Sequence, residues 1–161
     1  MEDINMNDKV WQDPAWFIAF GFGSGLLPFA PGTWGTLAAI PVFLCISSTH
    51  WLIYALITAL LFALGVRVSD QVSKSLGVHD YPGIVWDEVV GYLLTMFLVP
   101  VSAYTLLAGF ILFRIFDIWK PFPIRVIDAK VQGGLGIMLD DVLAAIPAWI
   151  ILQLLVWGFG L

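Results

Sequence analysis

The sequence predicts an all-helical integral membrane protein with a single domain, residues 1–161. Hydrophobic residues make up 60% of the chain and charged residues only 12%, against roughly 25% charged residues in an average soluble domain. The mean hydropathy is +0.93, so lipid is the expected solvent for much of the chain. Charges gather in two polar islands, residues 67–88 and 114–141, between long uncharged runs. We therefore expect several short transmembrane or re-entrant helices, a Gly/Pro-rich N-terminal loop and two polar cytoplasmic islands.

The first fourteen residues form an acidic head. Four acids stand there against Lys9 alone, whereas a secretory signal peptide begins with a basic segment followed by an apolar one. No cleaved signal peptide is expected, and residues 1–14 are predicted to be a solvated, partly disordered polar tail.

Residues 14–66 carry no formal charge and are expected to lie largely in the membrane. The segment 20–36 is rich in glycine and proline, which disfavour a regular helix, and predicts an ordered loop. Residues 37–46 and 51–66 are better helix candidates, and the polar break between them suits a turn. These two helices would form a hairpin that is short for two full spans.

Residues 89–113 form an uncharged run of 25 that Pro100 interrupts. One kinked helix of this length would rise about 37 Å and place the two polar islands on opposite membrane faces. A hairpin that turns near Pro100 would return both ends to one face. The positive-inside rule favours the hairpin, because the bases of both islands then share the cytoplasmic face. Residues 142–161 match the length of one transmembrane helix.

Charge and cysteine content exclude two classes of function. The net charge is -5 and the seven lysines and arginines are scattered, so no basic block could follow a phosphate backbone and no nucleic-acid partner is expected. The single cysteine, Cys45, lies in an apolar run and is predicted to be a small buried hydrophobe, without a metal cluster around it.

The main chemical signal is a set of carboxylates at the ends of the apolar runs. Asp87 and Glu88 precede one run, and Asp140 and Asp141 precede the last one. Acids at helix N-termini have a simple structural explanation, because they cap free N–H groups and complement the helix dipole. So many acids in a chain with few bases also favour a hard divalent cation, and oxygen ligands without cysteine indicate Mg²⁺. Asp117 is the next candidate ligand.

Basic side chains near these acids are candidates for binding a phosphate. Arg114, Asp117 and Lys120 are three residues apart, which places them close to one face of a helix. A structural ladder of salt bridges explains this face as well as a metal site does. In a metal site, Arg114, Lys120 and Arg125 would hold an anion. The glycines between 21 and 35 are similarly ambiguous, since such turns serve tight packing or present backbone N–H groups to phosphate.

Four segments of the chain carry distinctive motifs: GFGSGLLPFAPGTWGTLAAIP (21–41), GVHDYPGIVWDEVVG (77–91), FRIFDIWKPFPIRVID (113–128) and GGLGIMLDDVLA (133–144). Together and in this order they resemble the phosphatidylglycerophosphatase A family of bacterial membrane lipid phosphatases. The resemblance implies a helical fold and Mg²⁺-dependent hydrolysis of phosphatidylglycerophosphate to phosphatidylglycerol and phosphate. It also implies a multi-pass protein of the bacterial cytoplasmic (inner) membrane, with its active site facing the cytoplasm.

The residues agree with this reaction class by exclusion. No histidine, cysteine or aspartate stands in a motif that would form a covalent phosphoenzyme, so metal-assisted attack by water is the economical mechanism. The predicted metal-binding and catalytic residues are Asp87, Glu88, Asp117, Asp140 and Asp141. The predicted phosphate-binding residues are Arg114, Lys120, Arg125, Ser24, Gly32 and Thr33.

Two other functions stay open on the sequence alone. In a small membrane transporter or channel subunit, acids inside the spans would line an ion path, whereas here they lie at the ends of the apolar runs. In a non-catalytic membrane assembly factor, the acidic pairs would be helix caps only. Membrane lipids are expected partners, and the sequence does not determine the oligomeric state.

Overall fold

The computed structural model describes residues 5–122 and 124–160, and this part of the chain is helical without any strand. The elements in chain order are α1 (Met6–Gln12), α2 (Pro14–Ala19), the 3-10 helix η1 (Ser24–Leu26), α3 (Pro31–Ile46), α4 (Trp51–Leu76), α5 (Trp86–Thr95), α6 (Ala103–Trp119), α7 (Ile124–Lys130) and α8 (Gly133–Phe159). The predicted fold class is confirmed.

In the part of the chain that the structure describes, two helices, α4 and α8, are long and apolar enough to cross a membrane. They have 26 and 27 residues, so each is about 40 Å long. Their outward faces carry large exposed apolar side chains, among them Leu56 and Leu60 on α4 and Leu154 and Trp157 on α8. Such faces suit hydrocarbon rather than water, and the protein is therefore a helical membrane protein.

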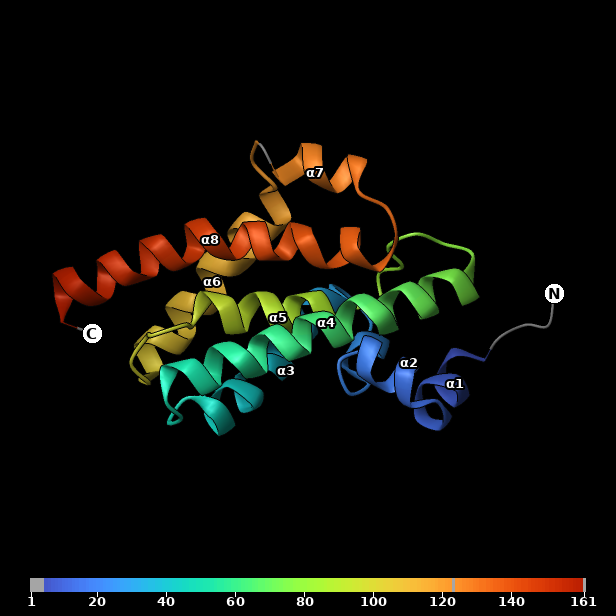
Figure 1. The fold of residues 1–161 in the computed structure, drawn as a ribbon, viewed down its shortest axis with the longest axis horizontal. Coiled ribbons are helices and arrows are strands. Elements are labelled where there is room, and N and C mark those ends of the chain that lie inside the picture. The colour runs from blue at the N-terminus through green and yellow to red at the C-terminus, as the bar shows by residue number, and fades with distance from the viewer. Residues whose placement is uncertain (1–4, 123, 161) are drawn as a thin grey trace.

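Helix α5 lies at the centre of the bundle, with α3, α4, α6 and α8 packed around it (Figure 1). It has ten residues, too few to span a bilayer. Most of them are buried, and Tyr92 and Leu93 are completely so. Apart from this central core, a smaller cluster of buried hydrophobic side chains joins α1 and α2 to the C-terminal half of α4 through Val10, Trp16 and Val72. Because α5 is buried, the acids in its first turn are held inside the protein.

The predicted hairpin over residues 89–113 is confirmed. Helix α5 ends at Thr95 and α6 begins at Ala103, after a break that contains Pro100. Ser102 starts α6 with a capping box, in which its hydroxyl accepts a hydrogen bond from the third helical N–H at 3.1 Å. Helix α6 then runs back beside α5, and its C-terminal half reaches the α5 N-terminus. The two polar islands therefore meet at one end of the bundle.

Several helix boundaries differ from the prediction, and three of the differences are large. Helix α4 continues past residue 66 to Leu76 through the first polar island, α3 begins at Pro31, inside the predicted loop, and α8 begins at Gly133. Proline is favourable at the first position of a helix because its missing N–H would have no partner there. The α8 glycines start the helix because it packs closely on α4: a Cβ on Gly134 would lie 1.9 Å from the carbonyl oxygen of Val66.

Two predictions about single segments are also corrected. The acidic head contains helix α1, whose Val10 is completely buried against the bundle, so only part of residues 1–14 can be a polar tail; residues 1–4 lie outside the described part. Cys45 is exposed rather than buried. It follows Leu44, which is also exposed, on a face of α3 where an apolar side chain needs no protein cover in a membrane.

Candidate active site

Three carboxylates from two helices meet inside the bundle. Asp87 and Glu88 lie in the first turn of α5, and Asp141 lies in α8. One carboxylate oxygen of each residue lies within 4.8 Å of the other two. The exposed fraction of Asp141 is 1% and that of Asp87 is 6%, so water screens these charges poorly. We call this group the three-carboxylate cluster.

The three-carboxylate cluster has unused capacity to bind a cation. Asp87 Oδ1, Glu88 Oε2 and Asp141 Oδ2 are buried and accept no hydrogen bond from the described residues. Burial raises the pKa of Glu88 to about 7, and the charge of Asp117 acts in the same direction. Burial and the adjacent Glu88 raise the pKa of Asp87 well above its usual range. A hard divalent cation would relieve this repulsion, and carboxylate oxygens are its preferred ligands.

Capping does not explain the acidic pair in α8. Asp140 and Asp141 lie seven and eight residues beyond Gly133, where the helix begins, whereas an N-cap bonds to the N–H groups of the first turn. The first two N–H groups of α8 donate instead to His79 Nε2 at 3.0 Å and to Asp70 Oδ1 at 3.2 Å. The interpretation of Asp140 and Asp141 as residues at the start of the last helix is therefore wrong.

Two cations border the three-carboxylate cluster. Arg114 Nη1 lies 2.5 Å from Asp117 Oδ2 and 3.6 Å from Glu88 Oε1. Lys120 forms a hydrogen-bonded ion pair with Asp140. Asp117 and Asp140 were predicted as metal ligands, but the structure pairs each with a cation and leaves both outside the group of three close oxygens. Arg114 lies directly beside the cluster at Glu88, and Lys120 pairs with Asp140, the residue that precedes Asp141.

The start of α3 reaches the same place. A Cβ on Gly32 would lie 2.0 Å from Glu88 Oε1 and 2.9 Å from Arg114 Nη1, so only glycine fits there without displacing these groups. Gly32 and the partly exposed Thr33 belong to the first turn of α3. Pro31 has no N–H and the Thr33 N–H donates to the carbonyl oxygen of Ala30 at 2.9 Å, so an anion at this helix end would depend on the helix dipole and on the N–H groups that remain. The Gly/Pro-rich segment therefore approaches the acids, as expected for a phosphate-binding segment.

The two remaining predicted phosphate-binding residues, Ser24 and Arg125, make no described hydrogen bond or ion pair with the three-carboxylate cluster. Ser24 lies in η1, where its hydroxyl donates to the carbonyl oxygen of Phe20 at 3.5 Å. Arg125 is exposed on α7, and no ion pair joins it to an acid in the described part of the chain. Their predicted role stays a prediction.

Asp70 and His79 were not among the predicted site residues, although both position α8. They bond to the N–H groups at the start of this helix and so fix the part of it that carries Asp141. The sequence signal for this role is weak: a helix that begins with glycines has no strong cap of its own, and Gln132 makes no side-chain cap bond.

Comparison with known proteins assigns the family. The statistical model of the family described as Phosphatidylglycerophosphatase A matches residues 17–156. The chain belongs to this family. The matched region contains the three-carboxylate cluster and both cations, so the family resemblance and the geometry concern the same part of the molecule.

Relatives of this chain include two proteins that carry the family's name. The phosphatidylglycerophosphatase A of Escherichia coli strain K12 is 42% identical over 146 residues, which cover 90% of this chain and 85% of that protein. That of Haemophilus influenzae is 48% identical over 141 residues, or 86% of each protein. A third relative, from Bacteroides thetaiotaomicron, is 36% identical over 152 residues, which cover 89% of this chain and 94% of that protein, and is named provisionally as a phosphatidylinositol-3-phosphatase. No solved structure shows significant similarity to this chain.

Proposed function

We infer that this protein is a phosphatidylglycerophosphatase, which hydrolyses phosphatidylglycerophosphate to phosphatidylglycerol and phosphate in phospholipid biosynthesis. Its membership of the family and two relatives named for this activity support the inference. The geometric observation that carries it is the three-carboxylate cluster with Arg114 and Lys120 beside it, inside a membrane bundle. A phosphate monoester on a membrane lipid is a substrate that such a site can reach.

We propose that Asp87, Glu88 and Asp141 hold a Mg²⁺ ion. Three observations support this. The carboxylate oxygens lie close together, one oxygen of each residue accepts no hydrogen bond from the described residues, and all the donor atoms are oxygens. When bound, Mg²⁺ would polarise a phosphoryl oxygen and activate a water for attack. A carboxylate of the cluster would accept the proton that this water gives up.

The cations and the α3 N-terminus have a complementary role in the proposal. Phosphoryl transfer depends mainly on positioning and on stabilising the charge of the phosphoryl oxygens. Arg114 and Lys120 supply this positive charge, and Asp117 and Asp140 keep the two side chains in place. In this proposal the backbone at Gly32, which lies close to Glu88 and Arg114, and the hydroxyl of Thr33 would complete the phosphate pocket.

We also propose that the protein crosses the bacterial cytoplasmic membrane several times with both polar islands in the cytoplasm. The bases of the two islands support this orientation by the positive-inside rule. The ion pairs between α5, α6 and α8 are consistent with one shared face. Phosphate released at that face enters the cytoplasm.

A panel of lipid phosphates tests the proposed substrate. Purified protein in detergent with Mg²⁺ is given phosphatidylglycerophosphate, phosphatidic acid or phosphatidylinositol 3-phosphate, and phosphate release is measured. We expect kcat/KM to be highest for phosphatidylglycerophosphate, with the Asp141→Asn protein as the inactive control. A higher value for phosphatidylinositol 3-phosphate would assign a different headgroup, and no release from any lipid would favour a transporter or an assembly factor.

A further inference from the structure

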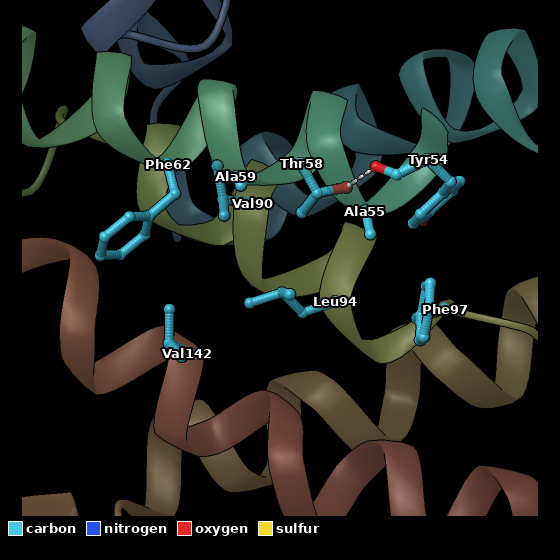
Figure 2. A pocket seen from close by; sticks show the side chains of 9 residues that line it. All are labelled: Tyr54, Ala55, Thr58, Ala59, Phe62, Val90, Leu94, Phe97 and Val142. Atoms are coloured by element: carbon cyan, nitrogen blue, oxygen red, sulfur yellow. Dashed lines mark hydrogen bonds between the residues drawn. The ribbon is translucent and has the colours of Figure 1, made fainter. Parts of the chain in front are cut away.

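An apolar groove runs along α5 between α4 and α8 (Figure 2). One cavity of about 320 Å³ is lined by the α4 face from Tyr54 to Phe62, by Val90 and Leu94 of α5, by Phe97, and by Val142 of α8. A second cavity of about the same volume shares Leu94, Phe97 and Val142 and continues along α8 to Trp149. The two cavities therefore adjoin at these shared residues, and we refer to them together as the groove.

The walls of the groove are α4 and α8, each of which is long enough to span a membrane. The side chains of α4 point toward α8, and Val142 points back from α8 toward α4 (Figure 2). The helices pack tightly near Gly65, where a Cβ would lie 2.7 Å from the Met138 side chain. The groove occupies the part of the α4–α8 pair beyond this contact, within the apolar segments of both helices.

The polar atoms of the lining are bonded within the protein. The Tyr54 hydroxyl donates to the carbonyl oxygen of Leu93 at 2.6 Å. The Thr58 hydroxyl donates to the backbone carbonyl oxygen of Tyr54 at 3.0 Å. The Trp149 indole N–H donates to the carbonyl oxygen of Phe97 at 2.8 Å. The groove therefore presents hydrocarbon, and a polar ligand would find few partners in it.

One end of the groove lies near the three-carboxylate cluster. Val90 lies three residues after Asp87, about one turn along the same face of α5, and Val142 is the residue after Asp141 in α8, on a neighbouring face of that helix. From Val142 to Trp149 the groove follows α8 for seven residues, which is about 10 Å. A molecule with a phosphate at one end and a hydrocarbon chain at the other matches this arrangement.

We propose that the groove holds one acyl chain of the lipid substrate while the phosphate lies at the three-carboxylate cluster. The proposal rests on the proposed function and extends it to the part of the substrate that distinguishes a lipid from a soluble phosphate monoester. A chain that leaves bilayer hydrocarbon for this groove gains packing rather than removal from water. The groove therefore acts mainly by holding the phosphate ester in position over the acids.

Filling the groove tests the proposal. Ala59 and Ala55 both line the groove on α4, so Ala59→Phe and Ala55→Phe place a ring in the path of the chain. The matched control is Leu60→Trp, which adds bulk on the same helix at a side chain that is 61% exposed and outside the groove. Each protein is assayed in detergent with dioleoyl and dihexanoyl phosphatidylglycerophosphate.

We expect the unaltered protein to prefer the dioleoyl substrate. Ala59→Phe should lower kcat/KM for that substrate at least tenfold, since a displaced ester is poorly placed for attack, and should change the value for the dihexanoyl substrate less than threefold. Ala55 lies further from the acids than Ala59, so Ala55→Phe should change kcat/KM for the dihexanoyl substrate even less than Ala59→Phe does. Equal losses for both substrates, or unchanged kinetics in both variants, would overturn the proposal.

A binding experiment separates this proposal from the proposed function. Phosphatidylglycerophosphate with a photoactivatable diazirine in mid-chain is crosslinked to the unaltered protein, and the labelled peptides are mapped by mass spectrometry. We expect labels between Tyr54 and Phe62 and between Val142 and Trp149. Labels spread evenly over the outward faces of α4 and α8 would overturn the groove assignment even if the enzyme is active. Labels in the groove of a protein that releases no phosphate would overturn the proposed function alone.

Discussion

Adjacent acids in α8 have different neighbours. Asp140 pairs with Lys120, whereas Asp141 joins Asp87 and Glu88. Successive residues of an α-helix point about 100° apart, so two neighbouring side chains of a buried helix face different parts of the protein. The chemistry that follows is different as well: one acid positions a cation, and the other belongs to the proposed metal site.

Replacing the acids by amides of the same shape separates these roles. Asp87→Asn and Asp141→Asn should each insert and fold but lose phosphatase activity at least about 100-fold, because a negative ligand is removed from the proposed ion. Asp140→Asn should mainly raise KM for the lipid, since Lys120 loses the partner that positions it. The assay is phosphate release over a range of Mg²⁺ and lipid concentrations.

The control for these variants is Asp8→Asn, an exposed acid on α1, which should keep unaltered kinetics. Near-normal turnover of Asp87→Asn and Asp141→Asn at saturating Mg²⁺ would move the active site elsewhere in the molecule.

Gly32 gives a second test at the level of one residue. The methyl group of Gly32→Ala would overlap Glu88 Oε1 and approach Arg114 Nη1, so activity should fall at least tenfold while the protein still folds. Gly158→Ala in α8 is the matched control, because its Cβ would meet nothing within 4 Å. Phosphate release decides the prediction, and equal activity of the two variants would show that α3 does not shape the site.

At the scale of elements, the placement of α8 depends on its contact with α4. Gly134 lies against the backbone of Val66, and Asp70 of α4 bonds to the first turn of α8. A backbone carbonyl cannot move aside as a flexible side chain can. The position of Asp141 is therefore set by helix packing at some distance from it.

Gly134→Ala should destabilise the protein although alanine is the better helix former. A Cβ 1.9 Å from the Val66 carbonyl oxygen forces the two helices apart, and overpacking of this kind costs about 1–3 kcal/mol. Thermal unfolding in detergent should show a lower Tm than in the unaltered protein, and Gly158→Ala on the same helix should not. A Tm of Gly134→Ala at or above the unaltered value would contradict the described packing.

The sequence was informative about element types and less so about their ends. Hydrophobic runs and Pro100 predicted the helices and the hairpin, because these depend on local composition. The extension of α4 to Leu76 and the start of α8 at Gly133 depend on close contact between distant segments, which local patterns do not contain. For the same reason the five predicted acids could be listed, but not divided into cluster members and partners of Arg114 and Lys120.

At the scale of the whole molecule, the fold brings two distant polar islands to one end of the bundle. Glu88 of the first island lies near Arg114 of the second, and His79 of the first bonds to the start of α8. The turn between α3 and α4 and the C-terminal part of α8 lie toward the other end (Figure 1). Only an arrangement with both islands on one membrane face keeps the site intact.

Cysteine labelling in intact cells tests this arrangement. In a Cys45→Ser background, Val78→Cys and Lys130→Cys place one thiol in each island, and Ser48→Cys places one in the turn between α3 and α4, all at exposed positions. A membrane-impermeant reagent should label Ser48→Cys from outside and reach the other two only after the cells are opened. External labelling of one island and not the other would contradict the shared face.

The central claim is that Asp87, Glu88 and Asp141 form the centre of a metal-dependent lipid phosphatase, and metal removal tests it most directly. Phosphate release from phosphatidylglycerophosphate by the purified protein is measured before chelation, after exhaustive treatment with EDTA, and after Mg²⁺ is returned. The arrangement of the three carboxylates predicts that EDTA abolishes turnover and that Mg²⁺ restores it in the unaltered protein but not in Asp141→Asn. Full turnover after exhaustive chelation would contradict the claim.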